Sequence, residues 1–90
     1  MSLLSPQLLA FIKIAENKTV HAAAAELFLT QTAVTQRIRS LEQSLKTTLF
    51  IRTRKGMLLT QEGEALLRYC QASLELEEEA LANIHGSGVD

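Results

Sequence analysis

Polar side chains recur at spacings of three and four residues between positions 31 and 46, and their types suit hydrogen bonding in a groove. A glutamine amide carries a donor beside an acceptor, which matches the edge of adenine, and a forked guanidinium matches guanine or phosphate. The same composition also occurs on the solvated faces of many helical bundles. The stripe alone leaves both interpretations open; its members are Thr32, Thr35, Gln36, Arg39, Gln43 and Lys46.

Charge is divided unevenly along the chain, although the formal net charge is only −1. Residues 30–60 carry a net charge of +5, residues 61–90 carry −6, and residues 1–29 are neutral overall. A total near zero argues mildly against a nucleic-acid partner, whose binders usually have a basic surface. A basic block confined to one segment is instead the electrostatic footprint expected for phosphate. The split therefore favours nucleic acid as the partner.

No other set of reactive side chains converges at a recognisable spacing. The single cysteine, Cys70, excludes an internal disulfide and fits a small apolar residue in a helix seam. His21 and His85 each lack a second ligand at metal-binding spacing. No nucleophile with a base and no paired carboxylates stand out. We therefore expect no catalytic residue, no metal, no cofactor and no enzymatic activity.

Size and composition indicate one small domain. The chain has 90 residues, of which 47% are hydrophobic and 21% charged, which is a globular balance. The apolar runs are too short to cross a bilayer. The first residues lack the charged region and long apolar core of a signal peptide. We expect a protein of the reducing cytoplasm that makes no membrane contact.

Helix signals place the polar stripe on the third of four helices. Ser5 before Pro6 is a helix start, and the apolar spacing that follows predicts a helix over residues 6–16. Thr19 begins a second, alanine-rich helix that ends near Phe28. Thr30 begins a third helix over residues 31–45. The short connection between the second and third helices predicts a helix-turn-helix in a mainly α-helical fold.

A change of pattern after residue 49 predicts a hairpin and then a long helix. Two β-prone runs flank Arg54-Lys55-Gly56, which indicates a two-stranded hairpin within residues 49–59. Thr60 begins the last helix, over residues 61–84, with Glu62 and Glu64 in its first turn. Residues 86–90 are glycine-rich and are expected to form a flexible tail.

Apolar residues at heptad-like spacing form a seam along the last helix. Such a seam pairs helices, and a chain with a thin core gains stability as half of a dimer. The same side chains could equally fill an intramolecular core, so both uses stay open. Glu77 interrupts the seam, whose members are Leu67, Cys70, Leu74, Leu81 and Ile84.

Two stretches, 23–42 and 49–63, resemble the DNA-binding domain of LysR-type transcriptional regulators. The first resembles their helix-turn-helix, with Ala23-Ala24-x-x-Leu27-x-Leu29-Thr30-Gln31-Thr32-Ala33-Val34-Thr35-Gln36-Arg37-Ile38-Arg39-x-Leu41-Glu42. The second resembles their wing and the start of their linker helix, with Leu49-Phe50-x-Arg52-x-x-Lys55-x-Met57-x-Leu59-Thr60-x-x-Gly63. The resemblance covers about residues 5–85.

The resemblance implies a winged helix-turn-helix in residues 1–60, with a three-helix core and a two-stranded wing, followed by a linker or dimerisation helix in residues 61–85. It implies sequence-specific binding of double-stranded promoter DNA by a homodimer, with the third helix in the major groove. An effector-binding domain, absent here, would follow in the full-length regulator. A helical protein-interaction domain without nucleic-acid binding is the alternative.

Carried over residue by residue, the resemblance also implies individual contacts. Thr32 stands where the family often has proline, and Gln36 stands where arginine is frequent, which would change the preferred half-site rather than the binding mode. Base contacts are implied for Gln31, Thr32, Thr35, Gln36 and Arg39. Backbone and wing contacts are implied for Thr30, Arg37, Arg52, Arg54 and Lys55.

Overall fold

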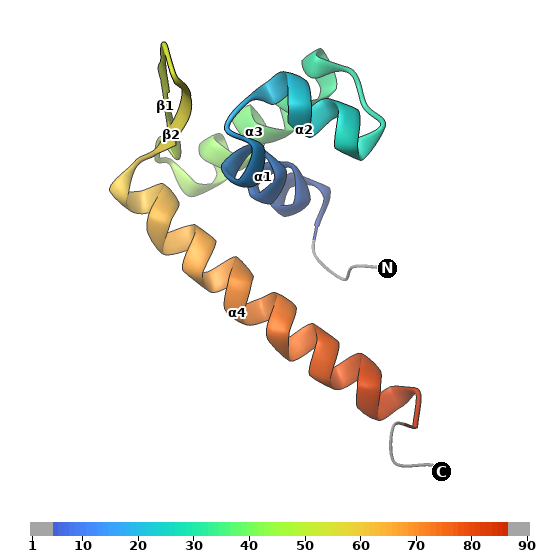
Figure 1. Ribbon diagram of the computed structural model, residues 1–90. Coiled ribbons are helices and arrows are strands. Elements are labelled where there is room, and N and C mark those ends of the chain that lie inside the picture. Colours follow the sequence, from blue (N-terminus) through green and yellow to red (C-terminus); the bar gives the residue numbers. More distant parts are fainter. Residues whose placement is uncertain (1–4, 87–90) are drawn as a thin grey trace.

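The computed structural model describes residues 5–86, in which three helices precede a two-stranded hairpin and a long fourth helix follows it (Figure 1). The predicted elements are confirmed almost to the residue; only the first helix runs one residue further than expected, and the second ends at Leu27. Apart from Gly86, the predicted tail lies outside the described residues. The elements are α1 (Pro6–Asn17), α2 (Val20–Leu27), α3 (Gln31–Leu45), β1 (Phe50–Thr53), β2 (Gly56–Leu59) and α4 (Gln61–Ile84).

Each helix begins at a hydroxyl residue that caps it. A Ser or Thr oxygen at the N-cap accepts a hydrogen bond from the backbone N–H three residues on, which satisfies a donor with no partner inside the helix. The four oxygen–nitrogen distances lie between 2.9 and 3.2 Å. Because this signal is local, the helix starts were readable from the sequence. The caps are Ser5, Thr19, Thr30 and Thr60.

The core lies where α1, α2 and α3 meet the first strand. Phe11 and Phe50 pack with ring centroids 5.3 Å apart. Ile14, Val34 and Leu49 are fully buried around them. The small side chains Ala23 and Ala24 are buried in α2 and permit close approach of the neighbouring helices. This core fixes the orientation of α3, whose other face is left exposed.

The hairpin is held against the end of α1. Strands β1 and β2 are antiparallel, with Phe50 opposite Leu59. The Met57 N–H donates to the carbonyl oxygen of Lys18 at 2.8 Å. Gly56 has φ +118°, and a β-carbon there would lie 2.5 Å from the same carbonyl oxygen. Only glycine fits this close approach, so Gly56 fixes the position of the hairpin beside the helices.

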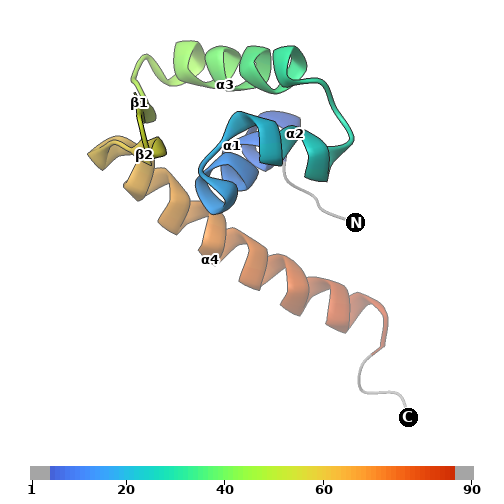
Figure 2. The same ribbon diagram turned by 45° about the horizontal axis from the view of Figure 1, so that its top comes forward.

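Helix α4 runs away from the hairpin, and its C-terminal part projects from the body of the domain (Figures 1 and 2). Its first half packs on α1: Cys70 is fully buried, and Leu67 and Leu74 are half-buried against the core. Of the two uses that the sequence leaves open for this seam, the structure shows the intramolecular one for Cys70, which belongs to the core of its own chain. No helix among residues 5–86 is long and apolar enough to span a membrane.

The apolar side chains that α4 leaves exposed form a second stripe, which shares only Ile84 with the predicted seam. Tyr69, Leu76 and Ile84 are 60%, 65% and 72% exposed. Their spacings of seven and eight residues place them on one side of the helix. Heptad spacing in the sequence did not reveal which of two neighbouring stripes would face the core. The exposed stripe of Tyr69, Leu76 and Ile84 is called the outer face of α4 below.

Candidate nucleic-acid interface

The outward side of α3 carries the polar residues that the sequence singled out. Gln31, Thr32, Gln36 and Arg39 are exposed, and Thr35 is half-buried. Val34 and Ile38 occupy the inward side and are buried. Because one side of α3 is anchored in the core, its exposed side forms a rigid row of hydrogen-bonding groups. A helix with this division of residues can enter a groove about as wide as the major groove of DNA.

Arg37 does not share this outward side. Residues two apart on a helix point in nearly opposite directions, so Arg37 lies on the far flank from Arg39. Its side chain is half-buried. Arg37 therefore points away from the side of α3 that carries Arg39.

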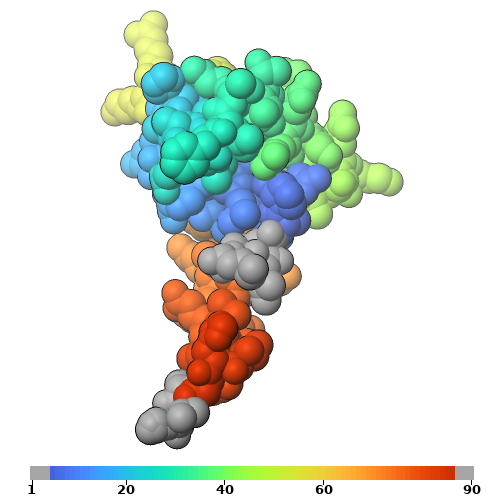
Figure 3. Space-filling view, turned by 90° about the vertical axis from the view of Figure 1, so that its right-hand side faces the viewer, coloured from blue at the N-terminus to red at the C-terminus, as the bar shows by residue number. Residues whose placement is uncertain are grey.

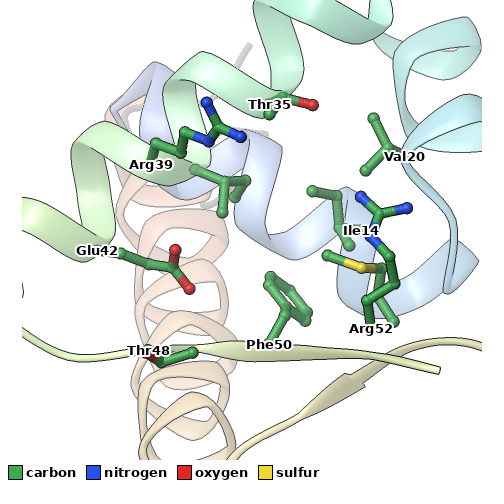
Figure 4. A pocket seen from close by; sticks show the side chains of 10 residues that line it. Ile14, Val20, Thr35, Arg39, Glu42, Thr48, Phe50 and Arg52 are labelled. Carbon is green, nitrogen blue, oxygen red and sulfur yellow. The ribbon is translucent and has the colours of Figure 1, made fainter.

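A pocket of about 210 Å³ lies between α3 and the hairpin (Figure 4). Its lining is mixed, with Ile14 and Phe50 among the apolar side chains and the carboxylate of Glu42 among the polar ones. Arg39 of α3 and Arg52 of β1 contribute guanidinium groups from two different elements, and Thr35 lies beside Arg39. The predicted groove-reading helix and the predicted wing therefore adjoin the same concave region. This arrangement allows one ligand surface to meet both elements at once.

Glu42 is the one acidic residue of the basic block, and it has a structural partner. Its Oε2 accepts a hydrogen bond from the Leu49 N–H at 2.7 Å. This bond spans the loop between α3 and β1 and holds Leu49 at the edge of the core. The carboxylate is thus engaged in positioning the hairpin relative to α3, which the sequence alone did not indicate.

The tip of the hairpin is basic and projects from the domain (Figure 3). Arg52, Arg54 and Lys55 are all exposed. The Thr53 hydroxyl donates to the Gly56 carbonyl oxygen at 2.8 Å and accepts from the Lys55 N–H at 3.2 Å. These bonds tighten the turn. The two basic side chains at the tip are therefore carried on an ordered turn.

The N-terminal third of the chain uses its acidic groups internally. The Lys13 Nζ lies 2.7 Å from the Glu26 carboxylate and 3.3 Å from that of Glu16. The Asn17 amide also donates to Glu26, at 3.0 Å. Hydrogen bonds from Lys13 and Asn17 lower the pKa of Glu26, and the bond with Glu26 raises the pKa of Lys13. The cluster ties α1 to α2 and so supports the helix-turn-helix.

One contact among the predicted site residues was missed at the sequence level. The Gln31 Nε2 lies 3.0 Å from the Nδ1 of His21, which is in the first turn of α2. The two residues are ten positions apart, and no local pattern joins them. Only the crossing of α2 and α3 brings them together.

The remaining reactive groups show no site within residues 5–86. No three His, Cys, Asp or Glu side chains in this part of the chain lie close enough to hold a metal ion. Cys70 is buried, and this burial raises the pKa of its thiol, which disfavours the reactive thiolate. The chemistry of the described surface is therefore that of hydrogen bonding and charge.

Comparison with known proteins decides the family. The family model described as "Bacterial regulatory helix-turn-helix protein, lysR family" matches residues 6–64. The chain belongs to the LysR family. The match covers the three-helix core, the hairpin and the first turn of α4, which together contain the basic block.

Named relatives of this LysR-family domain are transcriptional regulators. It is 39% identical over 80 residues to the HTH-type transcriptional regulator DgdR of Burkholderia cepacia, covering 89% of this chain and 27% of DgdR. It is 39% identical over 84 residues to YofA of Bacillus velezensis, covering 93% of this chain and 29% of YofA. The chain thus spans less than a third of the length of these curated relatives.

Solved structures of LysR regulators share the fold. The DNA-binding domain of CbnR, in a complex with DNA, superimposes with a TM-score of 0.80 at 31% identity, covering 92% of this chain and 95% of that domain. ArgP from Mycobacterium tuberculosis gives a TM-score of 0.83 at 39% identity, covering 93% of this chain and 32% of ArgP. The predicted winged helix-turn-helix is confirmed, and the chain is a LysR-family DNA-binding domain.

Proposed function

We propose that this domain binds promoter DNA sequence-specifically as a homodimer, on behalf of a longer bacterial regulator. In each subunit α3 lies in the major groove, and the hairpin lies along the neighbouring backbone. The observation that carries the proposal is the pocket shared by Arg39 of α3 and Arg52 of β1. Groove-reading side chains and backbone-binding side chains thereby adjoin one surface.

The exposed side of α3 supplies the groups that read sequence. Glutamine amides suit adenine, and Arg39 suits guanine or a phosphate. Threonine offers a methyl group for thymine and a hydroxyl group for either kind of base. Half-buried Thr35 lies beside the pocket and is the deepest of these residues. The proposed base-reading set is Gln31, Thr32, Thr35, Gln36 and Arg39.

The hairpin and the start of α3 supply the groups that hold the backbone. Arg52, Arg54 and Lys55 provide positive charge without a preference for any base, since phosphate contacts position a protein rather than specify a sequence. Thr30 caps α3, where the free N–H groups of the first turn favour an anion. These contacts would supply most of the salt-dependent affinity.

Dimerisation is proposed through α4. The helix is about 36 Å long at 1.5 Å per residue, and its C-terminal part projects from the domain. Its outer face, Tyr69, Leu76 and Ile84, is apolar and exposed, and Leu81 lies half-buried beside it. Pairing two such helices would bury these side chains. It would also carry the acidic ends of both chains away from DNA.

The proposed DNA binding also implies where the protein works and that it is not an enzyme. A regulator of bacterial promoters works where the chromosome lies, so we place this protein in the cytoplasm. The matched relatives are named as transcriptional regulators rather than enzymes, and the surface described above offers hydrogen bonding and charge. We therefore propose a binding function without catalysis, with an effector-binding domain on the remainder of the full-length chain.

Selection of bound duplexes from a random pool tests this function. The expected outcome is an enriched, interrupted palindrome whose half-sites are spaced by about a helical turn or a multiple of it. An enriched single half-site would contradict the homodimer. Failure to retard any duplex at low salt would contradict DNA binding and would favour a protein-interaction domain that uses the outer face of α4.

A further inference from the structure

A hydrogen bond joins the first turns of α2 and α3 on the proposed DNA-facing side. His21 is the second residue of α2, and Gln31 is the first residue of α3. The Gln31 Nε2 and the His21 Nδ1 lie 3.0 Å apart, and both side chains are exposed. The recognition helix is therefore linked, at the end whose residues reach base edges in helix-turn-helix proteins, to a side chain from the preceding helix.

The amide of Gln31 turns its nitrogen toward the ring of His21. Because an amide nitrogen only donates, the Nδ1 of His21 is the acceptor in this arrangement. One amide N–H of Gln31 is thereby occupied. The carbonyl oxygen and the second N–H remain available to a ligand. If the ring were replaced by a donor, the amide would have to turn its oxygen toward position 21 instead.

We infer that His21 is a positioning residue that sets the base preference of Gln31. The inference rests on the proposed function, in which Gln31 reads a base edge. With the amide held by His21, its oxygen can accept from the adenine N6–H and its free N–H can donate to N7. Guanine presents acceptors at both positions, so its O6 would face the Gln31 oxygen. His21 thus biases the amide toward adenine and against guanine.

The contact gains importance when DNA is bound. In the free protein both groups are exposed, and water competes for every donor and acceptor. Docking α3 in a groove removes water and leaves the amide with fixed partners on two sides. A wrongly oriented amide then leaves a buried donor or acceptor unpaired. Such an unpaired group costs its full desolvation free energy, which disfavours the wrong base.

The first step of the test identifies the base pair that Gln31 reads. A selected duplex is varied so that each A·T pair in turn becomes G·C, and dissociation constants are measured for the wild type and for Gln31→Ala. At one pair, Gln31→Ala should reduce the preference for A·T about tenfold, which is the typical effect of a good bidentate contact. The ratio of affinities at that pair is the readout for the next step.

The second step replaces the ring by groups of defined hydrogen-bonding sense. His21→Glu keeps an acceptor and should retain the wild-type ratio. His21→Lys offers only donors, should turn the amide and should abolish or reverse the preference. His21→Ala offers neither and should lower the ratio about threefold to tenfold, as expected when one hydrogen bond is removed.

Charge effects are separated by matched controls on the same helix. Ala25 is exposed on α2 one turn after His21, so Ala25→Glu and Ala25→Lys add the same charges near the His21–Gln31 contact without replacing either partner. These variants should shift the affinity for both duplexes equally and leave the ratio unchanged. His21→Lys should shift the ratio as well, whereas His21→Glu should change the affinity alone.

Each contrary outcome has a distinct meaning. If the wild type binds no duplex, the proposed function fails. If Gln31→Ala leaves every preference intact, DNA binding stands but Gln31 reads no base, and the inference is overturned. If Gln31→Ala removes a preference that all three His21 variants retain, the amide is oriented without His21, which also overturns the inference.

Discussion

At the scale of single residues, the basic surface of this domain depends on where the acidic side chains beside it are placed. Glu42 is engaged by the Leu49 N–H, and Glu26 is engaged by Lys13 and Asn17. Both carboxylates thereby stabilise the fold beside the proposed interface. The arginines of α3 and the hairpin retain free donors for a ligand.

Replacing Arg52 should weaken binding to all duplexes alike. Arg52 is exposed on β1 and lines the pocket beside α3, where a backbone phosphate is proposed to lie. In the homodimer, Arg52→Ala should reduce the slope of log affinity against log salt by about two units, about one for each subunit, because each subunit then neutralises one phosphate fewer. Binding titrations at several salt concentrations measure this slope.

Arg39→Ala, unlike Arg52→Ala, should weaken binding to some duplexes more than to others. Because Arg39 is proposed to reach a base edge, its removal should also reduce discrimination between duplexes, by about 1–3 kcal/mol if the base contact is bidentate. Arg68 lies on α4, outside the basic block, and Arg68→Ala is the matched control. If Arg68→Ala changed the salt slope as much as Arg52→Ala, the proposed wing contact would be wrong.

Acid should weaken the ion pair between Lys13 of α1 and Glu26 of α2. The pKa of Glu26 is lowered from an ordinary value of 4.5, so its contribution to the free energy of unfolding is present above that pH and is lost as pH falls through the lowered pKa. The pKa of Lys13 is raised above 10.5, so its contribution is present below that pH and is lost as pH rises through the raised pKa.

Glu26→Gln should therefore flatten the acid side of the stability profile. Urea unfolding at neutral pH and at about pH 3 should show a smaller difference in free energy of unfolding than in the wild type. Lys13→Met should flatten it as well, and the double variant should add little, because the two charges act on each other. If the wild type and Glu26→Gln lost the same free energy of unfolding in acid, the Lys13–Glu26 ion pair would not be the source of the acid sensitivity.

At the scale of elements, sequence and structure agree where the signals are local. The four hydroxyl caps and the apolar spacing predicted all four helices, and the residues around Gly56 predicted the hairpin. What the sequence leaves open depends on tertiary contacts. Heptad spacing does not tell whether Cys70 faces a partner or the core of its own chain, and the structure buries it in the core. The His21–Gln31 contact depends on how two helices cross.

The junction between the hairpin and α1 predicts a strong effect at Gly56. Gly56→Ala would place a β-carbon 2.5 Å from the Lys18 carbonyl oxygen at a φ of +118°. We expect a decrease of about 1–3 kcal/mol in the free energy of unfolding. Lys55→Ala, one residue earlier and exposed, should change stability by no more than about 0.5 kcal/mol. Chemical denaturation of both variants measures the difference, and equal stabilities would contradict the proposed docking.

At the scale of the whole molecule, the net charge of −1 conceals two opposed regions. The basic block lies on α3 and the hairpin, and most acidic residues lie on α4. The described part of the chain measures 51 × 27 × 23 Å, because α4 extends beyond the body. This shape lets one end of the chain meet DNA while the other meets a second copy.

The outer face of α4 should hold the dimer together. Replacing both Tyr69 and Leu76 by Ser removes two exposed apolar side chains and should weaken self-association at least tenfold, since each buried large side chain contributes about 1.5–3 kcal/mol. Sedimentation equilibrium measures the association constant. Glu78→Ser, on another side of α4, should leave it unchanged. A double Tyr69 and Leu76 variant that associates like the wild type would place the dimer contact elsewhere.

The most direct test of the account is the affinity for a selected duplex and for a shuffled one, each at 50 and 200 mM salt. Three basic side chains on each hairpin give a dimer about six phosphate contacts, so affinity for both duplexes should fall about a thousandfold over this range. At either salt the selected duplex should bind about a thousandfold more tightly. Affinity that is the same at both salts, or the same for both duplexes, would contradict sequence-specific DNA binding by this surface.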